Sequence, residues 1–261
     1  MSEVIINREG SVLRLKLNRP ERRNALNYSM IDSLLDSLEG VGKDDSCRVI
    51  VISGEGSGFC AGDDLHGMGQ TPNERWQGRK FGPAVLPQQA LIKTLRTLPK
   101  PVVTSIHGYA LGIGLDLALA SDIRICTHAT ELGDPRVERA LYAATGITYQ
   151  LPRVIGYGRA LGMMLMADRI QGKEAERIGM VYKSVPENKL QSFTDEIVEK
   201  LGKSATKSIA VIKEQIRTQI DMSYESSTFH SISVRNSYVI EDQAEGIEAF
   251  LQKRVPKFTG K

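Results

Sequence analysis

The first half of the chain alternates short apolar runs with segments in which apolar residues recur every three to four positions. Alternating or continuous runs of β-branched residues and leucine predict strands at 4–6, 12–17, 48–53, 102–106 and 123–126. Spacings of three and four residues predict helices at 30–38, at 90–98 and directly after Gly112-Ile-Gly114. Strands that alternate with helices in this way are typical of an α/β layer fold.

From about residue 156 the pattern becomes helical. Apolar spacing and capping residues predict helices at 159–167, 172–178, 190–201, 204–223 and 244–253. We therefore divide the chain into an α/β core, residues 1–195, and a helical C-terminal region, residues 196–261. No tract rich in Ser, Pro or Gly separates them, so we expect the C-terminal region to pack on the core or on a neighbouring subunit.

Residues 66–89 differ from both patterns. Gly, Pro, Gln and Asn are frequent there, and the apolar periodicity is poor. Such a stretch predicts a long loop or a loosely formed helix that covers a site.

Composition excludes several classes of protein. Of the 261 residues, 41% are hydrophobic and 25% are charged, as in ordinary folded domains. The net charge is +3 without a basic block, so we expect no nucleic-acid partner. The three cysteines form neither a disulfide framework nor a metal-ligand pattern. The N-terminus lacks a signal-peptide pattern and no apolar run is long enough for a membrane span, which predicts a soluble, cytoplasmic protein.

The first notable junction is Ser57-Gly-Phe-Cys-Ala-Gly-Asp-Asp-Leu65, directly after a predicted strand. Small residues at 60–62 let the backbone approach a ligand closely, and a helix starting at Asp63 would offer free N–H groups to an oxyanion or a phosphate. The alternative is a tight strand-to-helix turn that merely needs Gly62. The pattern alone favours that alternative.

A second junction, His107-Gly-Tyr-Ala-Leu-Gly-Ile-Gly-Leu-Asp116, also follows a predicted strand and begins a helix. A dinucleotide-binding turn would need a further glycine at Leu117, so we expect no nicotinamide cofactor. Two such junctions could direct backbone N–H groups at one oxygen, as in an oxyanion hole. Asp116 is then either a helix-start residue that interacts with the dipole or a carboxylate facing an apolar cleft.

Other candidate groups carry weaker signals. Cys60 has no identifiable base, so we interpret it as a buried structural thiol. The ionisable groups of residues 131–138 and 142–146 lie in an irregular stretch, where charges are usually solvated. No Gly-x-Ser-x-Gly motif supports Ser-His-Asp hydrolysis.

Together, five motifs in register over essentially the whole chain resemble the crotonase superfamily, the enoyl-CoA hydratase/isomerase family. They are Asn18-Arg-Pro20 with Arg23-Asn-Ala-Leu26, Phe59-Cys-Ala-Gly62 with Asp64-Leu65, Lys100-Pro-Val with His107–Gly112, Ala120-Ser-Asp122-Ile, and the C-terminal stretch Phe250–Gly260. The resemblance implies a ClpP/crotonase spiral of ββα units with a helical C-terminal trimerisation region. It also implies acyl-CoA thioester substrates, a homotrimer or dimer of trimers, and no tightly bound cofactor, because coenzyme A is part of the substrate.

The resemblance also assigns roles to residues. Two backbone N–H groups, those of Asp63 and Ile113, would polarise the thioester carbonyl and stabilise an enolate. Coenzyme A would contact residues of three segments, Arg22, Arg23, Ala25 and Leu26, then Ala61, Gly62, Asp63, Asp64 and Leu65, and finally Lys257 and Phe258 from a neighbouring subunit. The acyl pocket would include His66, Gly112, Arg136 and Leu141, with residues 66–89 and 136–148 shaping it.

Departures from the family pattern bear on the chemistry. Family hydratases use two glutamates, and here Asp116 stands at the first position and Arg136 at the second. An arginine cannot act as a base, so we expect Asp116 to be the single acid/base, with Glu138 and Tyr142 as candidates for a second role. Arg136 would lower the pKa of Asp116 or grip an anionic group of the substrate.

These observations predict an acyl-CoA-processing enzyme of the enoyl-CoA hydratase/isomerase type. Two-carboxylate hydration is disfavoured, whereas isomerisation, decarboxylation and thioester hydrolysis stay open. The rival hypothesis is an acyl-CoA-binding member of the family without chemistry.

Overall fold

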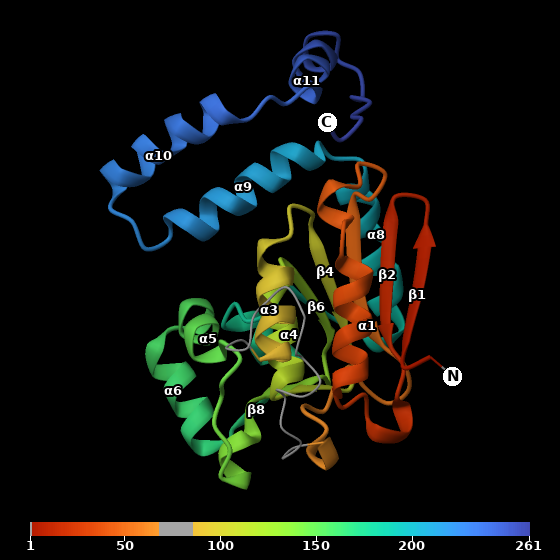
Figure 1. Cartoon of the computed structure of the whole chain (residues 1–261), viewed down its shortest axis with the longest axis vertical. Helices are drawn as coiled ribbons and strands as arrows, with labels where there is room; N and C mark the ends of the chain where they lie inside the picture. The colour runs from red at the N-terminus through yellow and green to blue at the C-terminus, as the bar shows by residue number, and fades with distance from the viewer. Residues whose placement is uncertain (1, 68–85) are drawn as a thin grey trace.

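The computed structural model describes residues 2–67 and 86–261. Its main element is a sheet in the order β1-β2-β3-β4-β6-β9. In this sheet β1 pairs antiparallel with β2, and all later neighbours are parallel. Its strands are β1 (Val4–Glu9), β2 (Val12–Leu17), β3 (Val49–Gly54), β4 (Val102–Ile106), β6 (Ile123–Thr127) and β9 (Lys183–Val185). The predicted α/β class is therefore confirmed (Figure 1).

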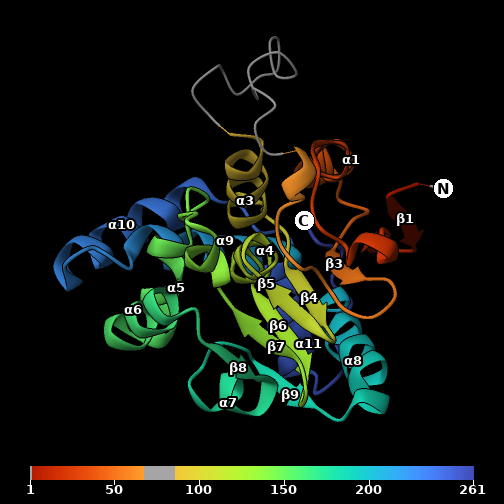
Figure 2. The ribbon, with the colours of Figure 1, turned by 90° about the horizontal axis from the view of Figure 1, so that it is seen from below.

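Helices cover both faces of this sheet (Figure 2). The α-helices of the described residues are α1 (Tyr28–Leu38), α3 (Pro87–Thr97), α4 (Ile113–Ala120), α5 (Ile147–Ile155), α6 (Tyr157–Met166), α7 (Gly172–Arg177), α8 (Leu190–Gly202), α9 (Thr206–Gln219), α10 (Tyr224–Ser237) and α11 (Asp242–Leu251). The larger apolar core joins Ile50 and Ile52 of β3 to α1, α3 and α4. Val49 and Val51 point to the opposite face, where α8 covers them. A strand buried on both faces needs such a continuous apolar run.

A second, smaller sheet lies next to the turn that begins α4 and to the segment after β3. It consists of β5 (Tyr109–Leu111), β7 (Glu131–Gly133) and β8 (Arg169–Gln171), with β5 and β7 parallel and β7 and β8 antiparallel. Gly108 turns the chain from β4 into β5 at a φ of 62°, and a Cβ there would lie 2.1 Å from the Ser57 carbonyl oxygen. Strands of three residues carry too little periodicity for the sequence pattern to predict them.

Several element boundaries differ from the predictions. Helix α3 begins at Pro87 rather than at residue 90, because proline fits the first turn of a helix, where no intrahelical N–H bond is needed. The predicted helix 204–223 is shorter, and α10, which was not predicted, follows it. Helix α10 lacks a single apolar face, and α5, also missed, contains Pro152. The remainder of the predicted loop, residues 68–85, lies outside the described residues.

Helix α8 packs along the main sheet, and the predicted boundary at 195/196 falls inside this helix. Helices α9, α10 and α11 form a separate layer beside the body (Figure 1). The Lys213 ammonium of α9 holds this layer, donating to Asp122 Oδ2 at 2.7 Å and to the Lys100 carbonyl oxygen at 3.1 Å.

The end of the chain folds back onto the body. The Arg48 guanidinium donates to the carbonyl oxygens of Ser204 and Phe258 at 2.6 and 3.0 Å. The Asp242 carboxylate accepts from the N–H groups of Thr259 and Gly260, both at 2.7 Å. Residues 204 and 258 are thus joined to the start of β3 through one side chain.

Two helical glycines provide a test of the packing that supports the site. A Cβ on Gly114 of α4 would lie 2.6 Å from the Cys60 carbonyl oxygen, whereas a Cβ on Gly158 of α6 would meet nothing within 4 Å. Gly114→Ala should lower the free energy of unfolding by about 1–3 kcal/mol through overpacking. The control Gly158→Ala should leave it unchanged or raise it by up to ~1 kcal/mol, because alanine favours helix. Urea unfolding measures both, and equal values in the two variants would contradict the predicted contact.

Candidate active site

The two predicted strand-to-helix junctions lie side by side. The Cys60 N–H donates to the Tyr109 carbonyl oxygen at 3.0 Å, and the Leu111 N–H donates to the Cys60 carbonyl oxygen at 3.0 Å. The segment that follows β3 is therefore an extension of the smaller sheet next to β5. The predicted structural role of Cys60 agrees with its burial, which raises the pKa of the thiol to about 12.

Two glycines lie where the two turns meet. Gly112, the residue before α4, has φ 53° and ψ −123°, a conformation that side chains disfavour. A Cβ on Gly112 would lie 3.7 Å from the Cα of Gly62, which itself has a φ of 121°. That distance leaves room for a Cβ, so it is the positive φ at Gly62 and Gly112, rather than a lack of space, that favours glycine at these turns.

Two backbone N–H groups lie at this contact. The Ile113 N–H belongs to the first turn of α4, where N–H groups have no intrahelical partner. On the other segment, the Leu26 N–H donates to the Gly62 carbonyl at 2.8 Å and the Asp64 N–H donates to the Leu26 carbonyl at 2.9 Å. Because bonding directions alternate along an extended chain, the Asp63 N–H points away from Leu26, and the Asp63 carboxylate accepts from it.

Asp116 lies on the first turn of α4 and is 0% exposed. Its carboxylate accepts two hydrogen bonds from Arg136 Nη2, at 3.1 Å to Oδ1 and 3.2 Å to Oδ2. The Thr145 hydroxyl donates to Oδ2 as well. Thus both oxygens of the carboxylate are held by side chains from the segment between β7 and α5.

Arg136 is itself fully engaged within the chain. Its Nε donates to Asp134 Oδ1 at 2.6 Å, its Nη1 to the Thr145 hydroxyl at 3.2 Å, and its Nη2 to Asp116. It lies in a short 3-10 helix (Pro135–Arg139) that begins after Asp134. In this arrangement the donors of Arg136 bind two carboxylates of its own chain, and a contact between Arg136 and an anionic group of the substrate stays a prediction.

Burial, rather than Arg136, decides the charge state of Asp116. Removal of the carboxylate from water raises its pKa to about 7, although Arg136 acts in the opposite direction. The neighbouring Asp134 and Asp63 add to the rise, since like charges disfavour ionisation. Burial also raises the pKa of Asp63, against Arg136 and hydrogen bonds from Gln88 and its own N–H. Arg136 thus lowers the pKa of Asp116 as predicted, but burial first, and the neighbouring carboxyl groups second, outweigh it, so the net shift is upward.

A cavity of about 290 Å³ opens beside the two turns. Several residues predicted from the sequence line it together: Arg23, Ala61, Gly62, Asp63, Leu65, Gly112, Arg136 and Leu141. Arg139 and Arg169 also line it, so its walls carry more positive than negative side chains. Such walls suit an anionic ligand.

Other predicted residues lie elsewhere. Glu138 is half-exposed and pairs with Arg139 and Arg169, and Tyr142 is 85% exposed, so neither reaches the Asp116 carboxylate. Their second catalytic role stays a prediction. His66 is exposed and lies next to Asp64, whose carboxylate contacts both the His66 ring and the Arg19 guanidinium.

The remaining predicted coenzyme A contacts also lie outside the cavity lining. Arg22 is exposed, and Ala25 and Leu26 form backbone hydrogen bonds beside the cavity. Lys257 and Phe258 lie in the folded-back C-terminus.

Three residues of the site were missed by the sequence analysis. Thr145 and Asp134 complete the shell around Arg136 and Asp116. Asn24, buried and quoted only as part of a motif, donates from Nδ2 to the carbonyl oxygens of Glu55 and Gly58, both at 2.8 Å. An asparagine or threonine in a loop carries no periodic signal, so only the neighbours in space reveal these roles.

Within residues 2–67 and 86–261, no three or more His, Cys, Asp and Glu residues are placed to hold a metal ion. No helix in those ranges is both long and apolar enough to cross a membrane.

The raised pKa of Asp116 predicts a pH-dependent stability. The group favours folding below its unfolded pKa near 3.8, and this contribution is lost as the pH rises through about 7. Asp116→Asn removes the titration, so its stability relative to the wild type should increase with pH, by on the order of a few kcal/mol between pH 5 and 8. Urea unfolding at four pH values measures this difference. A difference that is constant with pH would show that Asp116 ionises at its ordinary pKa.

The family model described as enoyl-CoA hydratase/isomerase matches residues 7–261. The 1,2-epoxyphenylacetyl-CoA isomerase of Escherichia coli K12 is 32% identical, with 100% of both chains covered. The 2,3-dehydroadipyl-CoA hydratase of the same organism is 31% identical with the same coverage.

Solved structures agree with this match. The enoyl-CoA hydratase from Bacillus anthracis has a TM-score of 0.90 at 29% identity, covering 99% of this chain and 100% of the other. The enoyl-CoA hydratase from Mycobacterium tuberculosis H37Rv has a TM-score of 0.89 at 26% identity, covering 100% of each chain. The predicted crotonase-like spiral is therefore confirmed, and the chain belongs to the enoyl-CoA hydratase/isomerase family.

Proposed function

We propose that this protein isomerises an acyl-CoA thioester, with Asp116 moving a proton on an enolate held by the N–H groups of Asp63 and Ile113. One observation carries the proposal. A single buried carboxyl with a pKa near 7 is held by an arginine that stands where family hydratases have their second glutamate.

The backbone donors stabilise the negative charge that develops on the thioester oxygen. Main-chain N–H groups suit this role, because they are fixed before the reaction and independent of side-chain identity. The Asp63 carboxylate accepts from its own N–H in the absence of substrate. A thioester carbonyl would accept from this N–H in place of the carboxylate.

Asp116 suits proton transfer in both directions. An acid/base is most effective when its pKa lies close to the working pH, since both forms are then populated. Hydration requires a second group that activates water, and Arg136 cannot supply it. Isomerisation needs only one group that removes a proton at one carbon and returns it at another. The relatives include hydratases as well as isomerases, so their names alone do not distinguish hydration from isomerisation for this chain.

Thr145 connects Asp116 to the acyl group in this proposal. Asp116 itself does not line the cavity, but the Thr145 hydroxyl both donates to its carboxylate and lines a groove beneath α9. The acyl group in that groove would exchange its proton with Asp116 directly or through this hydroxyl. The coenzyme A part would extend along the cavity, where Arg23, Arg139 and Arg169 face its phosphates.

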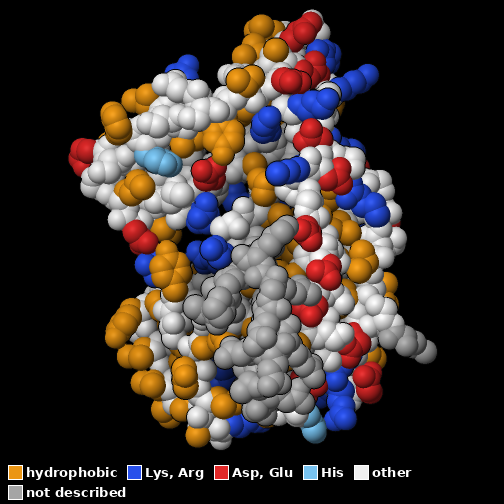
Figure 3. Space-filling model, viewed as in Figure 1, with side chains coloured by type: hydrophobic (Ala, Val, Ile, Leu, Met, Phe, Trp, Pro, Cys, Tyr) orange, Lys and Arg blue, Asp and Glu red, His pale blue; other side chains and the backbone are white. Residues whose placement is uncertain are grey.

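We also propose assembly into a homotrimer or a dimer of trimers. Helix α10 leaves Phe229 74% and Ile232 59% exposed, and on α6 Tyr157, Leu161 and Leu165 form a second exposed apolar stripe. Two different apolar surfaces on one chain favour a head-to-tail contact that closes into a ring. Apolar side chains of both regions are visible on the surface in Figure 3.

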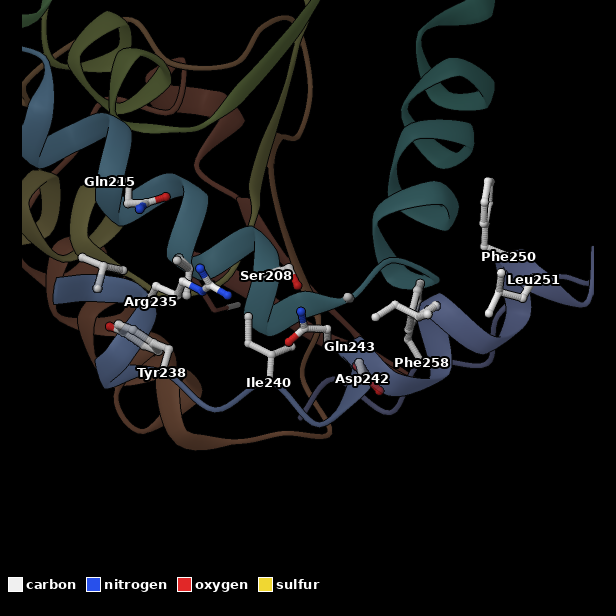
Figure 4. Close-up of a pocket in the computed structure, with 15 residues that line it drawn as sticks. Ser208, Gln215, Arg235, Tyr238, Ile240, Asp242, Gln243, Phe250, Leu251 and Phe258 are labelled. Carbon is white, nitrogen blue, oxygen red and sulfur yellow. The ribbon is translucent and has the colours of Figure 1, made fainter. Parts of the chain in front are cut away.

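The C-terminal helices leave a groove of about 710 Å³ between α9, α10 and α11 (Figure 4). Phe250 and Leu251 beside it are 82% and 73% exposed, which supports a neighbouring copy as its cover. Phe258 lines this groove, whereas Lys257 is exposed. In the assembly, Lys257 would therefore contact a neighbour's coenzyme A.

Asp116→Asn should lower the turnover of the wild-type substrate by about 10²–10⁴-fold, because the acid/base is lost. Affinity for an unreactive acyl-CoA should change little, since coenzyme A binds elsewhere. A panel of enoyl-, dienoyl- and β-keto-CoA thioesters, followed spectrophotometrically, identifies the substrate first. Thr145→Val should lower turnover about tenfold, and Thr145→Ser, which keeps the hydroxyl, should restore it.

Unchanged turnover in Asp116→Asn would remove this residue from the mechanism. Binding of acyl-CoA without turnover of any thioester by the wild type would favour the rival hypothesis, a protein that binds acyl-CoA without chemistry.

The wild type should sediment at three or six times the chain mass of 28.8 kDa. Phe229→Glu combined with Ile232→Glu should yield monomers, because burial of charge at an apolar contact is unfavourable. Asn188→Glu with Ser192→Glu adds the same charge at exposed positions around the start of α8, away from both apolar surfaces, and is the control. A wild type that sediments as a monomer would contradict the proposed assembly.

A further inference from the structure

The groove beneath α9 is lined by positively charged side chains. It has a volume of about 380 Å³ and lies between α3, α5 and α9, with Thr145 in its wall. Its described lining includes Lys93, Arg96 and Arg217 but no Asp or Glu. Figure 3 shows Lys and Arg side chains around a hollow between α9 and the body.

Gln150 supplies an independent sign of a ligand. The side chain is 3% exposed and lines the groove. Its Oε1 accepts from Arg96 Nη1 at 2.9 Å, while its Nε2 has no hydrogen-bond partner among the described residues. A buried donor without an acceptor costs about 1–3 kcal/mol, so an acceptor in the groove would offset this cost.

The backbone adds positive potential at the same place. Helix α5 begins at Ile147 after Gly146, which lines the groove and provides no side-chain cap. The positive end of the helix dipole and its free N–H groups favour an anion there.

The cations of the groove are available to a ligand. Lys93, Arg96 and Arg217 form no ion pair with any described residue, whereas nearby Lys213 and Arg153 are paired with Asp122 and Asp221. Lys213 fixes α9 on the body, and Arg217 follows it by four residues, on the same helix face. The Arg96 guanidinium also lies 5.2 Å from the centre of the Tyr149 ring.

We propose that this groove binds a carboxylate at the distal end of the acyl group, so that the substrate is the coenzyme A thioester of a dicarboxylic acid. The inference rests on the proposed function, because Thr145 links the groove to Asp116. A carboxylate has two oxygens, one for the Gln150 amide and one for the Arg96 guanidinium, with Lys93 and Arg217 neutralising its charge. The same donors suit a phosphate of coenzyme A, and the experiment separates the two sources.

Calorimetry with unreactive saturated thioesters tests the proposal without turnover. Succinyl-, adipyl- and suberyl-CoA are compared with butyryl-, hexanoyl- and octanoyl-CoA of equal chain length. The wild type should bind at least one dicarboxylic thioester about 10–100-fold more tightly than its monocarboxylic counterpart, as charge-assisted hydrogen bonds predict. Lys93→Met with Arg217→Met, and separately Gln150→Leu, should abolish this preference and leave the monocarboxylic affinity unchanged.

The exposed Lys189, which has no ion pair with a described residue, provides the matched control. Lys189→Met should keep the full preference. Equal affinity of the wild type for both members of every pair would overturn the inference and leave the proposed function intact. Equal weakening of both members by the groove variants would assign the groove to a coenzyme A phosphate and also overturn it. Failure of the wild type to bind any thioester would refute the proposed function itself.

Discussion

Contact between α4 and the segment after β3 is the constraint on which the candidate site depends. Gly114 permits it, because any side chain there would overlap the Cys60 carbonyl. Gly112 and Gly62 then take backbone conformations that other residues disfavour, and the N–H groups of Ile113 and Asp63 come to lie at one contact. Both N–H groups are main-chain atoms, so their positions depend on the backbone and not on side-chain chemistry. The Ile113 side chain itself is buried in the core.

In the buried charge cluster of Asp116, Asp134 and Arg136, burial and ion pairing have opposite effects on the pKa of Asp116. A guanidinium beside one carboxylate at the surface would lower the pKa of that carboxylate. Here Asp116 is fully buried, and Arg136 is shared with Asp134. The loss of hydration therefore outweighs the attraction between Asp116 and the shared Arg136, and the pKa of Asp116 rises. Asp116 thus has a pKa near 7 despite the arginine beside it, because burial has the larger effect.

The cations of this chain fall into two groups with different consequences. The first group has hydrogen-bond partners within the chain. Arg136 binds the Asp116 carboxylate, Lys213 fixes α9 on the body, and Arg48 fixes the C-terminus. Lys93 and Arg217 have no such partners among the described residues and line a groove. The C-terminal region thus does more than expose apolar surface to a neighbour, because α9 carries a cation to the same groove that contains Thr145.

The sequence by itself determined the α/β class, the strands at 12–17 and 102–106, the helical C-terminal region and the convergence of two glycine-rich junctions. These features follow from local periodicity and from glycine, whose effects act over a few residues. The family and most residues of the cavity also followed from motifs, including Gly62, Asp63 and Arg136.

Only the tertiary structure decided the charge of Asp116, the partners of Arg136 and the places of Glu138 and Tyr142. It also revealed Thr145 and Gln150, which lie close together at the start of α5, and Arg217 of the distant α9, and it brings all three into one groove. A pKa depends on the water removed and on every charge nearby, and an unpaired donor is defined by what surrounds it. Neither quantity is encoded in local spacing, because both arise only when distant segments pack together.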